Sequence, residues 1–277
     1  MIIEIASFNV EIEDQIYGNS AVLRTMVERF SCPTSQSADF RLRLHNQRFR
    51  YLELMNKANQ INGIRFLPLS SHATVFWFSD WASLFDWNNN TIDFYVDVSS
   101  HLYESFVLRN LKLLLMFHAN RTGRLMMHAS GVRKKDIVLV FSGRSGIGKS
   151  TTAKRFCARG WQLLNDECII VERNQKNMVA ASTPFCRLEL METCNQNEGK
   201  LSALFFLKHA RRHAIKEMTK RERIVSLASN SFLLPLNDNT CSRHMDICSD
   251  LATENCIYEL QTANENSVVD YVTSCFS

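Results

Sequence analysis

The chain has 277 residues, of which 45% are hydrophobic and 22% charged, and this is the composition of a globular protein rather than a disordered one. Its formal net charge of +4 is too small, without a concentrated basic patch, to indicate nucleic acid binding. The nine cysteines include no Cys-x-x-Cys pair, so we predict neither a zinc site nor the disulfide framework of a small secreted domain.

The sequence also gives no sign of targeting or of a membrane segment. The N-terminal residues lack the basic and apolar regions of a signal peptide. The most apolar run, residues 111–117, is far too short to span a bilayer. We therefore expect a cytoplasmic protein that interacts with neither membrane nor nucleic acid.

Residues 1–100 are predicted to form a strand-rich lobe. Residues 2–13 and 40–54 alternate between apolar and polar side chains, while residues 73–85 and 91–99 are rich in aromatic and β-branched residues. The tryptophans of this lobe could form a docking surface, but packing within a sheet is the simpler interpretation. These residues are Trp77, Trp81 and Trp87.

A helix and two strands are predicted next. Residues 101–123 have apolar side chains at helical spacing and end in Gly123, a suitable C-cap. Residues 124–132 and 136–143 read as two strands around a tight basic turn. Because no Pro- or Gly-rich linker follows the lobe, we expect domain 1–100 to pack directly on a second domain, 101–277.

A complete phosphate-binding pattern, GxxxxGK[ST], follows the second of these strands. It consists of Gly143, Arg144, Ser145, Gly146, Ile147, Gly148, Lys149 and Ser150. The glycines let backbone N–H groups turn inward around a phosphate, Lys149 supplies positive charge, and the Ser150 hydroxyl can bind Mg²⁺. The helix predicted to start here, with Thr151 in its first turn and Gly160 as its stop, would present its N-terminus to the phosphate. We therefore predict a nucleotide site, with ATP and Mg²⁺ as the expected ligands.

An acidic pair, Asp166 and Glu167, follows Lys149 after only 17 and 18 positions. This spacing leaves room for one short helix and one strand, so the carboxylates should emerge close to the phosphates. One carboxylate can complete the Mg²⁺ shell while its neighbour accepts a proton from an attacking hydroxyl. The ordinary alternative is a solvated Asn-Asp-Glu turn between two strands.

The order of these motifs resembles the catalytic domain of HPr kinase/phosphorylase, which shares its P-loop fold with phosphoenolpyruvate carboxykinases. The matching segments, all within residues 101–235, are His128-Ala129, the phosphate loop, Gly160, the acidic pair, Thr183-Pro184-Phe185 and the apolar run 203–207. The resemblance implies an α/β fold, in which a P-loop kinase domain of this type carries the strand-rich lobe. It also favours a homo-oligomer.

The resemblance further implies roles for individual residues. Asp166 matches the general base that deprotonates a serine hydroxyl, and Glu167 matches a second acid nearer the metal, where the family usually has Asp. His128 matches an active-site histidine; without the resemblance, a core histidine on a strand would be the simpler interpretation.

Residues 1–100 look like the strand-rich part of HPr-kinase-like proteins that are encoded beside peptide-modification genes, including the cassette type ScmC. We therefore expect Mg-ATP-dependent transfer of the γ-phosphoryl group to a serine-type hydroxyl of a peptide or protein, with the lobe contributing to substrate recognition. A small-molecule kinase and a non-catalytic nucleotide-binding partner in a peptide-modifying system are the alternatives.

Residues 208–224 contain seven Lys or Arg and are predicted to form a turn and a helix. They could hold an acidic peptide or a triphosphate, with Arg211 or Arg212 as the candidates to reach the γ-phosphate. A solvated helix is the simpler interpretation. Near the C-terminus, residues 257–261 and 267–272 suggest a strand and a closing helix.

Overall fold

The chain has a mixed α/β fold that divides into two compact units, Met1–Leu113 and Leu114–Ser277. The computed structural model describes residues 2–5, 8–13, 25, 28–31, 38–46, 59–61, 64–70, 72–78, 81–96, 103–175, 177–186, 198–234, 238–263 and 265–276. The division falls inside helix α2 (Tyr103–Arg121), slightly beyond the boundary at residue 100 that the sequence suggests.

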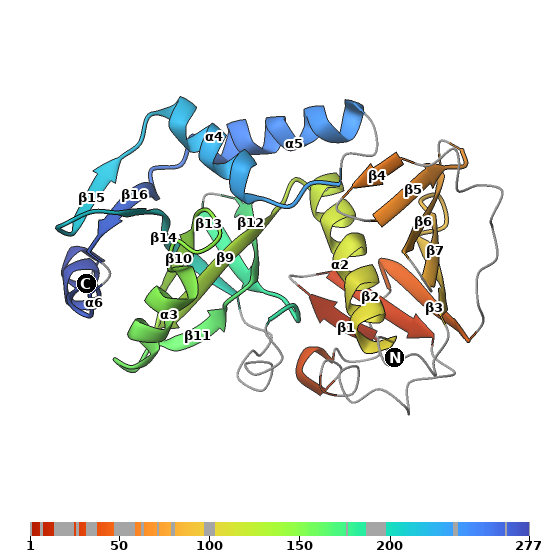
Figure 1. The fold of residues 1–277 in the computed structure, drawn as a ribbon, viewed down its shortest axis with the longest axis horizontal. Helices are drawn as coiled ribbons and strands as arrows, with labels where there is room; N and C mark the ends of the chain where they lie inside the picture. Colours follow the sequence, from red (N-terminus) through yellow and green to blue (C-terminus); the bar gives the residue numbers. More distant parts are fainter. Residues whose placement is uncertain are drawn as a thin grey trace. The chain divides into compact units, whose positions relative to one another are not determined.

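The first unit contains a sheet with the strand order β1-β2-β3-β8-β7-β6-β5-β4 (Figure 1). Its strands are β1 (Ile2–Ile5), β2 (Phe8–Glu13), β3 (Phe40–Asn46), β4 (Asn59–Ile61), β5 (Ile64–Pro68), β6 (Ala73–Phe78), β7 (Trp81–Asp86) and β8 (Thr91–Val96). The strand-rich character predicted for residues 1–100 is confirmed for the described part of this unit. Within the predicted strand 40–54, residues 47–54 lie outside the described residues.

Alternation of side chains explains how this sheet buries one face. On β3, Phe40, Leu42 and Leu44 are buried, whereas the residues between them are partly or fully exposed. On the same face, the Ser83 hydroxyl of β7 hydrogen-bonds the Asn110 amide oxygen of α2. The α2 helix ends as predicted, because Gly123 adopts a left-handed conformation with φ 78° and Arg124 N–H donates to the Ala119 carbonyl.

The tryptophans of this unit contribute to packing within the sheet. Trp81 is 2% exposed and lies edge-on to Phe94, with ring centroids 5.9 Å apart. Trp77 and Trp87 are half-buried, and Trp87 lies 4.9 Å from the ring of Phe85. This arrangement supports the sheet-packing interpretation over a docking surface.

The second unit contains a curved sheet with the strand order β10-β9-β12-β13-β14-β16-β15. Its strands are β9 (Leu125–Lys134), β10 (Ile137–Ser142), β11 (Gln162–Asn165), β12 (Cys168–Asn174), β13 (Asn177–Ser182), β14 (Glu198–His209), β15 (Ala214–Glu217) and β16 (Ile257–Thr262). Strand β10 pairs with both β9 and β14, and β11 joins the sheet beside β9. Because β10, β14 and β16 are parallel, their carboxyl ends meet at one edge of the sheet.

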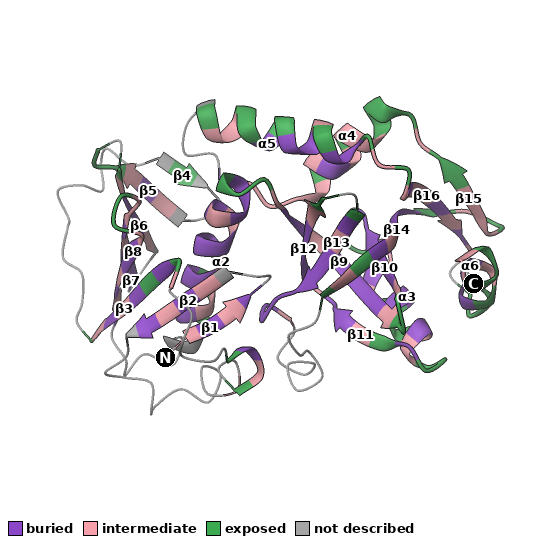
Figure 2. Ribbon diagram, turned by 180° about the vertical axis from the view of Figure 1, so that it is seen from behind, coloured by how far each residue is buried: buried purple, intermediate pink, exposed green. Residues whose placement is uncertain are grey.

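Helices cover both faces of this sheet. One face packs against α4 (Lys220–Asn230) and α5 (Asp238–Leu251), and the other packs against α3 (Lys149–Cys157) and α6 (Ser267–Phe276). Burial on both sides explains why the runs 137–142 and 203–207 are almost continuously apolar. Strands β9, β10 and β12 are accordingly buried along most of their length (Figure 2).

Residues 208–224 differ from the predicted turn and helix. Strand β14 continues to His209, a short turn carries Arg211 and Arg212, β15 follows, and α4 begins only at Lys220. Strand β15 forms because it pairs antiparallel with β16 and its Ile215 packs on the core beside α6. The predicted strand and closing helix near the C-terminus are confirmed as β16 and α6.

Within the part of the chain that the structure describes, no helix is long and apolar enough to cross a membrane. The seven cysteines among the described residues form no disulfide with one another.

Candidate active site

The predicted phosphate-binding loop lies between β10 and α3, as its sequence context indicates. Its three glycines adopt positive φ values of 140° at Gly143, 79° at Gly146 and 104° at Gly148. A Cβ atom on Gly143 would lie 3.2 Å from the Ile147 side chain and 3.6 Å from the Leu207 backbone. The loop therefore turns tightly and approaches β14 closely, for which glycine is the suitable residue.

Lys149 begins α3 and is only 6% exposed. Its ammonium group donates to the carbonyl oxygens of Gly143 at 2.9 Å and Arg144 at 3.3 Å. Burial lowers the Lys149 pKa, and the nearby Glu167 carboxylate opposes that shift. The cation thus lies across the loop, close to an acidic residue.

The N-terminus of α3 is suited to an anion. The first N–H groups of a helix have no acceptor within the helix, and the N-cap residue, Gly148, provides no capping side chain. These groups, together with the Lys149 ammonium, form a donor set that fits phosphate oxygens. Ser150 and Thr151 lie in this first turn.

The acidic pair lies in the turn between β11 and β12, directly after the strand that follows α3. Asp166 is 2% exposed, and Glu167 is half-buried. The Asp166 carbonyl accepts hydrogen bonds from the hydroxyls of Ser130 at 3.2 Å and Ser150 at 3.5 Å. The turn is therefore joined to both β9 and the phosphate loop and is not an ordinary solvated turn.

The donor atoms of Ser150 and Glu167 can be compared with those that Mg²⁺ prefers. A hydroxyl that donates its hydrogen to a carbonyl keeps oxygen lone pairs for a cation. The Glu167 carboxylate, near enough to act on the Lys149 pKa, would add the oxygen ligand that Mg²⁺ prefers. The donor atoms of Ser150 and Glu167 therefore fit a hard divalent cation.

Asn165 is a further residue of this site, to which the sequence motifs assign no role. Its side-chain oxygen accepts from the backbone N–H groups of Glu167 at 2.8 Å and Cys168 at 3.0 Å. Its amide nitrogen donates to the Thr183 carbonyl at 2.7 Å. The only sequence signal was an Asn directly before the acidic pair, since Asn side chains often form such local turns.

Thr183, part of the Thr-Pro-Phe segment, reaches the same turn. Its hydroxyl donates to the Cys168 carbonyl at 2.8 Å and accepts from the Phe185 N–H at 3.3 Å. The segment 183–185 therefore borders the acidic turn.

His128 lies on β9 between the loop and the acidic turn. It is opposite Cys168 of β12, and its carbonyl accepts from the Ser142 hydroxyl at 3.0 Å. Its half-buried ring stacks on Phe232, with centroids 6.0 Å apart. The sheet thus brings His128, the phosphate loop and Asp166-Glu167 to one edge.

Arg211 and Arg212 are less closely associated with the site. Both are exposed in the turn after β14, a strand whose carboxyl end lies at the same edge as the phosphate loop. No hydrogen bond or ion pair joins either residue to the described residues of the loop.

A sequence model of the family described as SynChlorMet cassette protein ScmC matches residues 97–247, more than half of the chain. The chain belongs to the ScmC family. The ScmC match includes the phosphate loop, His128, the acidic pair and the segment 183–185, and it confirms the subgroup that the sequence resembles. It leaves out the strands of the first unit as well as β16 and α6.

Other comparisons add little to the ScmC assignment. The chain matches no curated protein. Among solved structures, it is similar to the HPr(Ser) kinase/phosphatase from Coxiella burnetii, with 9% identity and a TM-score of 0.31. That match covers 54% of this chain and 91% of the other, and at this score it describes a partial likeness only.

Proposed function

We propose that this ScmC protein is a Mg-ATP-dependent kinase that transfers the γ-phosphoryl group to a serine-type hydroxyl of a peptide or protein. The observation that carries the proposal is the Asp166 backbone carbonyl, which accepts a hydrogen bond from Ser150 of the phosphate loop. The buried Asp166 is thereby attached to the helix turn that would bind the phosphates. The acceptor class rests on the resemblance of the motifs to HPr kinase/phosphorylase.

In this proposal the loop binds and orients the donor. The N–H groups at the start of α3 and the Lys149 ammonium hold the phosphate oxygens. Ser150 and Glu167 would hold Mg²⁺, which supplies neutralisation of the charge on the phosphates. Most of the rate enhancement then comes from positioning and electrostatics.

Asp166 accepts the proton of the attacking hydroxyl. As the new bond from the hydroxyl oxygen to the γ-phosphorus forms, the bond from that phosphorus to the bridging oxygen breaks and ADP leaves. A base held beside the phosphate loop needs no large movement to reach this proton. His128, at the same edge, would orient the phosphate oxygens.

The proposal is tested by incubating the protein with γ-labelled ATP and Mg²⁺, using as acceptors the peptides encoded beside its gene and a host lysate. We expect a labelled peptide or protein with the native chain. We expect none with Asp166→Asn, which should still bind Mg-ATP.

Other results would change the assignment. Full phosphoryl transfer by Asp166→Asn would contradict the assignment of Asp166 as the general base. A labelled small molecule would indicate a small-molecule kinase, and ATP binding without any labelled acceptor would indicate a non-catalytic partner.

A further inference from the structure

Asn165 uses nearly all of its hydrogen-bonding capacity on the backbone around the acidic pair. It is fully buried, with 0% exposure, and its three bonds of 2.7–3.0 Å go to Glu167, Cys168 and Thr183. A primary amide offers one acceptor oxygen and two N–H donors, so one side chain here fixes both sides of the turn. The sequence motifs assign this residue no role.

Two serine hydroxyls also hold the turn, by hydrogen bonds to its backbone carbonyl. The hydroxyls of Ser130 and Ser150 donate to the Asp166 carbonyl, while the Asn165 oxygen accepts from the two following N–H groups. None of these bonds uses the carboxylate of Asp166 or Glu167. The network therefore fixes the backbone from which both carboxylates extend.

We infer that Asn165 is a positioning residue for phosphoryl transfer, acting through the backbone of Asp166 and Glu167. This inference rests on the proposed kinase function. Because Asn165 forms no bond with the phosphate loop among the described residues, its loss should not weaken the binding of ATP measured without Mg²⁺, in which Glu167 takes no part as a metal ligand. Its loss should instead let the acidic turn shift, and a displacement of about 1 Å of a catalytic group costs on the order of 10²-fold in rate.

Two variants separate the two halves of the amide. Asn165→Ala removes all three bonds. Asn165→Asp keeps an acceptor for Glu167 and Cys168 but, when ionised, loses the donor to Thr183. A positioning role therefore predicts a graded loss, with Asn165→Asp retaining more activity than Asn165→Ala.

A buried asparagine elsewhere provides the control. Asn120 is 5% exposed, and its amide donates to the Thr240 carbonyl at 3.3 Å, away from the acidic turn. Asn120→Ala removes a similar buried bond and should lower the melting temperature without changing turnover.

The experiment measures three quantities on the full chain. Amide hydrogen exchange without ligand reports the hydrogen bonds of the Glu167 and Cys168 N–H groups. Steady-state turnover of Mg-ATP, with water or peptide as acceptor, gives kcat and KM. Calorimetry gives the ATP dissociation constant. For Asn165→Ala we expect exchange at residues 167 and 168 to accelerate at least about 10-fold as these bonds are lost. We expect kcat to fall by about 10²-fold, while the ATP dissociation constant measured without Mg²⁺ stays within about 3-fold of the native value.

Three results would overturn the inference. If kcat for Asn165→Ala equals that of the native chain, Asn165 positions nothing. If ATP affinity falls as far as kcat, or if Asn120→Ala loses as much turnover, the effect is a general loss of structure. If the native chain binds ATP but never turns it over, the proposed function fails instead, and that result is recognised without any variant.

Discussion

The Lys149 ammonium group lies across its own loop and donates to the carbonyls of Gly143 and Arg144. Asn165 and Ser130 likewise bond to backbone atoms of the acidic turn. Polar side chains that bond to the backbone hold the loop and the turn in shape before any ligand arrives. At the residue scale, this pre-organisation is what distinguishes the site from a set of matching motifs.

Lys149→Ala should abolish tight ATP binding. A hydrogen bond to a charged group contributes about 1.5–3 kcal/mol, so removing the ammonium should raise the Mg-ATP dissociation constant by roughly 10–100-fold or more. Calorimetric titration checks this. Lys154→Ala, which removes an exposed lysine from the same helix, is the matched control and should bind normally. Unchanged binding by Lys149→Ala would contradict the nucleotide site.

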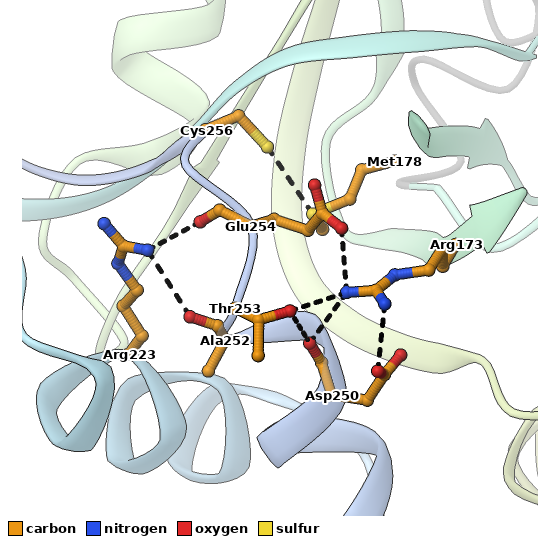
Figure 3. A network of polar contacts seen from close by, with 8 residues as sticks. All are labelled: Arg173, Met178, Arg223, Asp250, Ala252, Thr253, Glu254 and Cys256. Atoms are coloured by element: carbon orange, nitrogen blue, oxygen red, sulfur yellow. Dashed lines mark hydrogen bonds and ion pairs between the residues drawn. The ribbon is translucent and has the colours of Figure 1, made fainter. Parts of the chain in front are cut away.

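At the element scale, the stability of the second unit depends on the contacts that hold α5 and the loop after it against the sheet. Arg173 of β12 donates to the Asp250 carbonyl at 2.9 Å and the Thr253 hydroxyl at 2.7 Å, and it forms ion pairs with Asp250 and Glu254 (Figure 3). Arg223 of α4 donates to the Glu254 carbonyl from the other side. The loop between α5 and β16 is thus fixed by two arginines from different elements.

Arg173→Ala should destabilise the fold measurably. Its ion-pair partners are partly exposed, which reduces their contribution, but two hydrogen bonds and two ion pairs are lost together. We expect a loss of about 1–2 kcal/mol in the free energy of unfolding, measured by urea denaturation. Arg159→Ala, which breaks an exposed pair with Asp270, should cost less than about 0.5 kcal/mol. Equal costs for both variants would contradict the importance of the network.

The contact between α5 and the end of α4 should make stability depend on pH. His244 is 3% exposed, its Nε2 lies 2.8 Å from the Ser231 hydroxyl, and burial lowers its pKa below the usual 6.5. Below pH 6.5 the unfolded chain therefore binds a proton that the folded chain does not, and stability falls as the pH decreases further.

Replacing the histidine should remove this dependence. Between pH 7.5 and 5.5, we expect the native chain to lose stability relative to His244→Gln, by at most about 1.4 kcal/mol per pH unit. Urea midpoints at each pH give the comparison, and His209→Gln, at an exposed position, is the control. If the urea midpoints of the native chain and of His244→Gln change equally with pH, the proposed pKa shift of His244 is contradicted.

At the scale of the whole molecule, nucleotide binding is expected to belong to the second unit alone. Every predicted phosphate and metal ligand lies after Leu113, in a unit with buried clusters on both faces of its own sheet. The first unit has a separate sheet, for which we propose a part in substrate recognition.

A fragment of residues 101–277 tests this division. We expect it to bind Mg-ATP within about 3-fold of the full chain, because a domain with its own core can fold alone. We expect it to lose transfer to the peptide acceptor. The same fragment carrying Lys149→Ala is the binding control. A fragment that transfers to the peptide as well as the full chain would remove the proposed role of the first unit.

The sequence by itself determined the local parts of this protein. The strand, loop and helix around residues 137–157, the glycine that ends α2 and most strands of the first unit follow from side-chain spacing and turn residues, which act over a few positions. Strands β4 and β5 lie outside the segments that the sequence predicts as strands. The acidic pair could also be placed close to the loop, because only one helix and one strand separate them.

Only the tertiary structure decided the contacts between distant segments. Asn165 bonds Thr183, 18 positions later, and Asp166 accepts from Ser130, 36 positions earlier. Strand β15 forms because β16, more than 40 residues further along the chain, pairs with it. The local sequence around β15 is equally compatible with a helix. Such contacts depend on the register between strands, which no single segment encodes, and they determine how the motifs meet in one site.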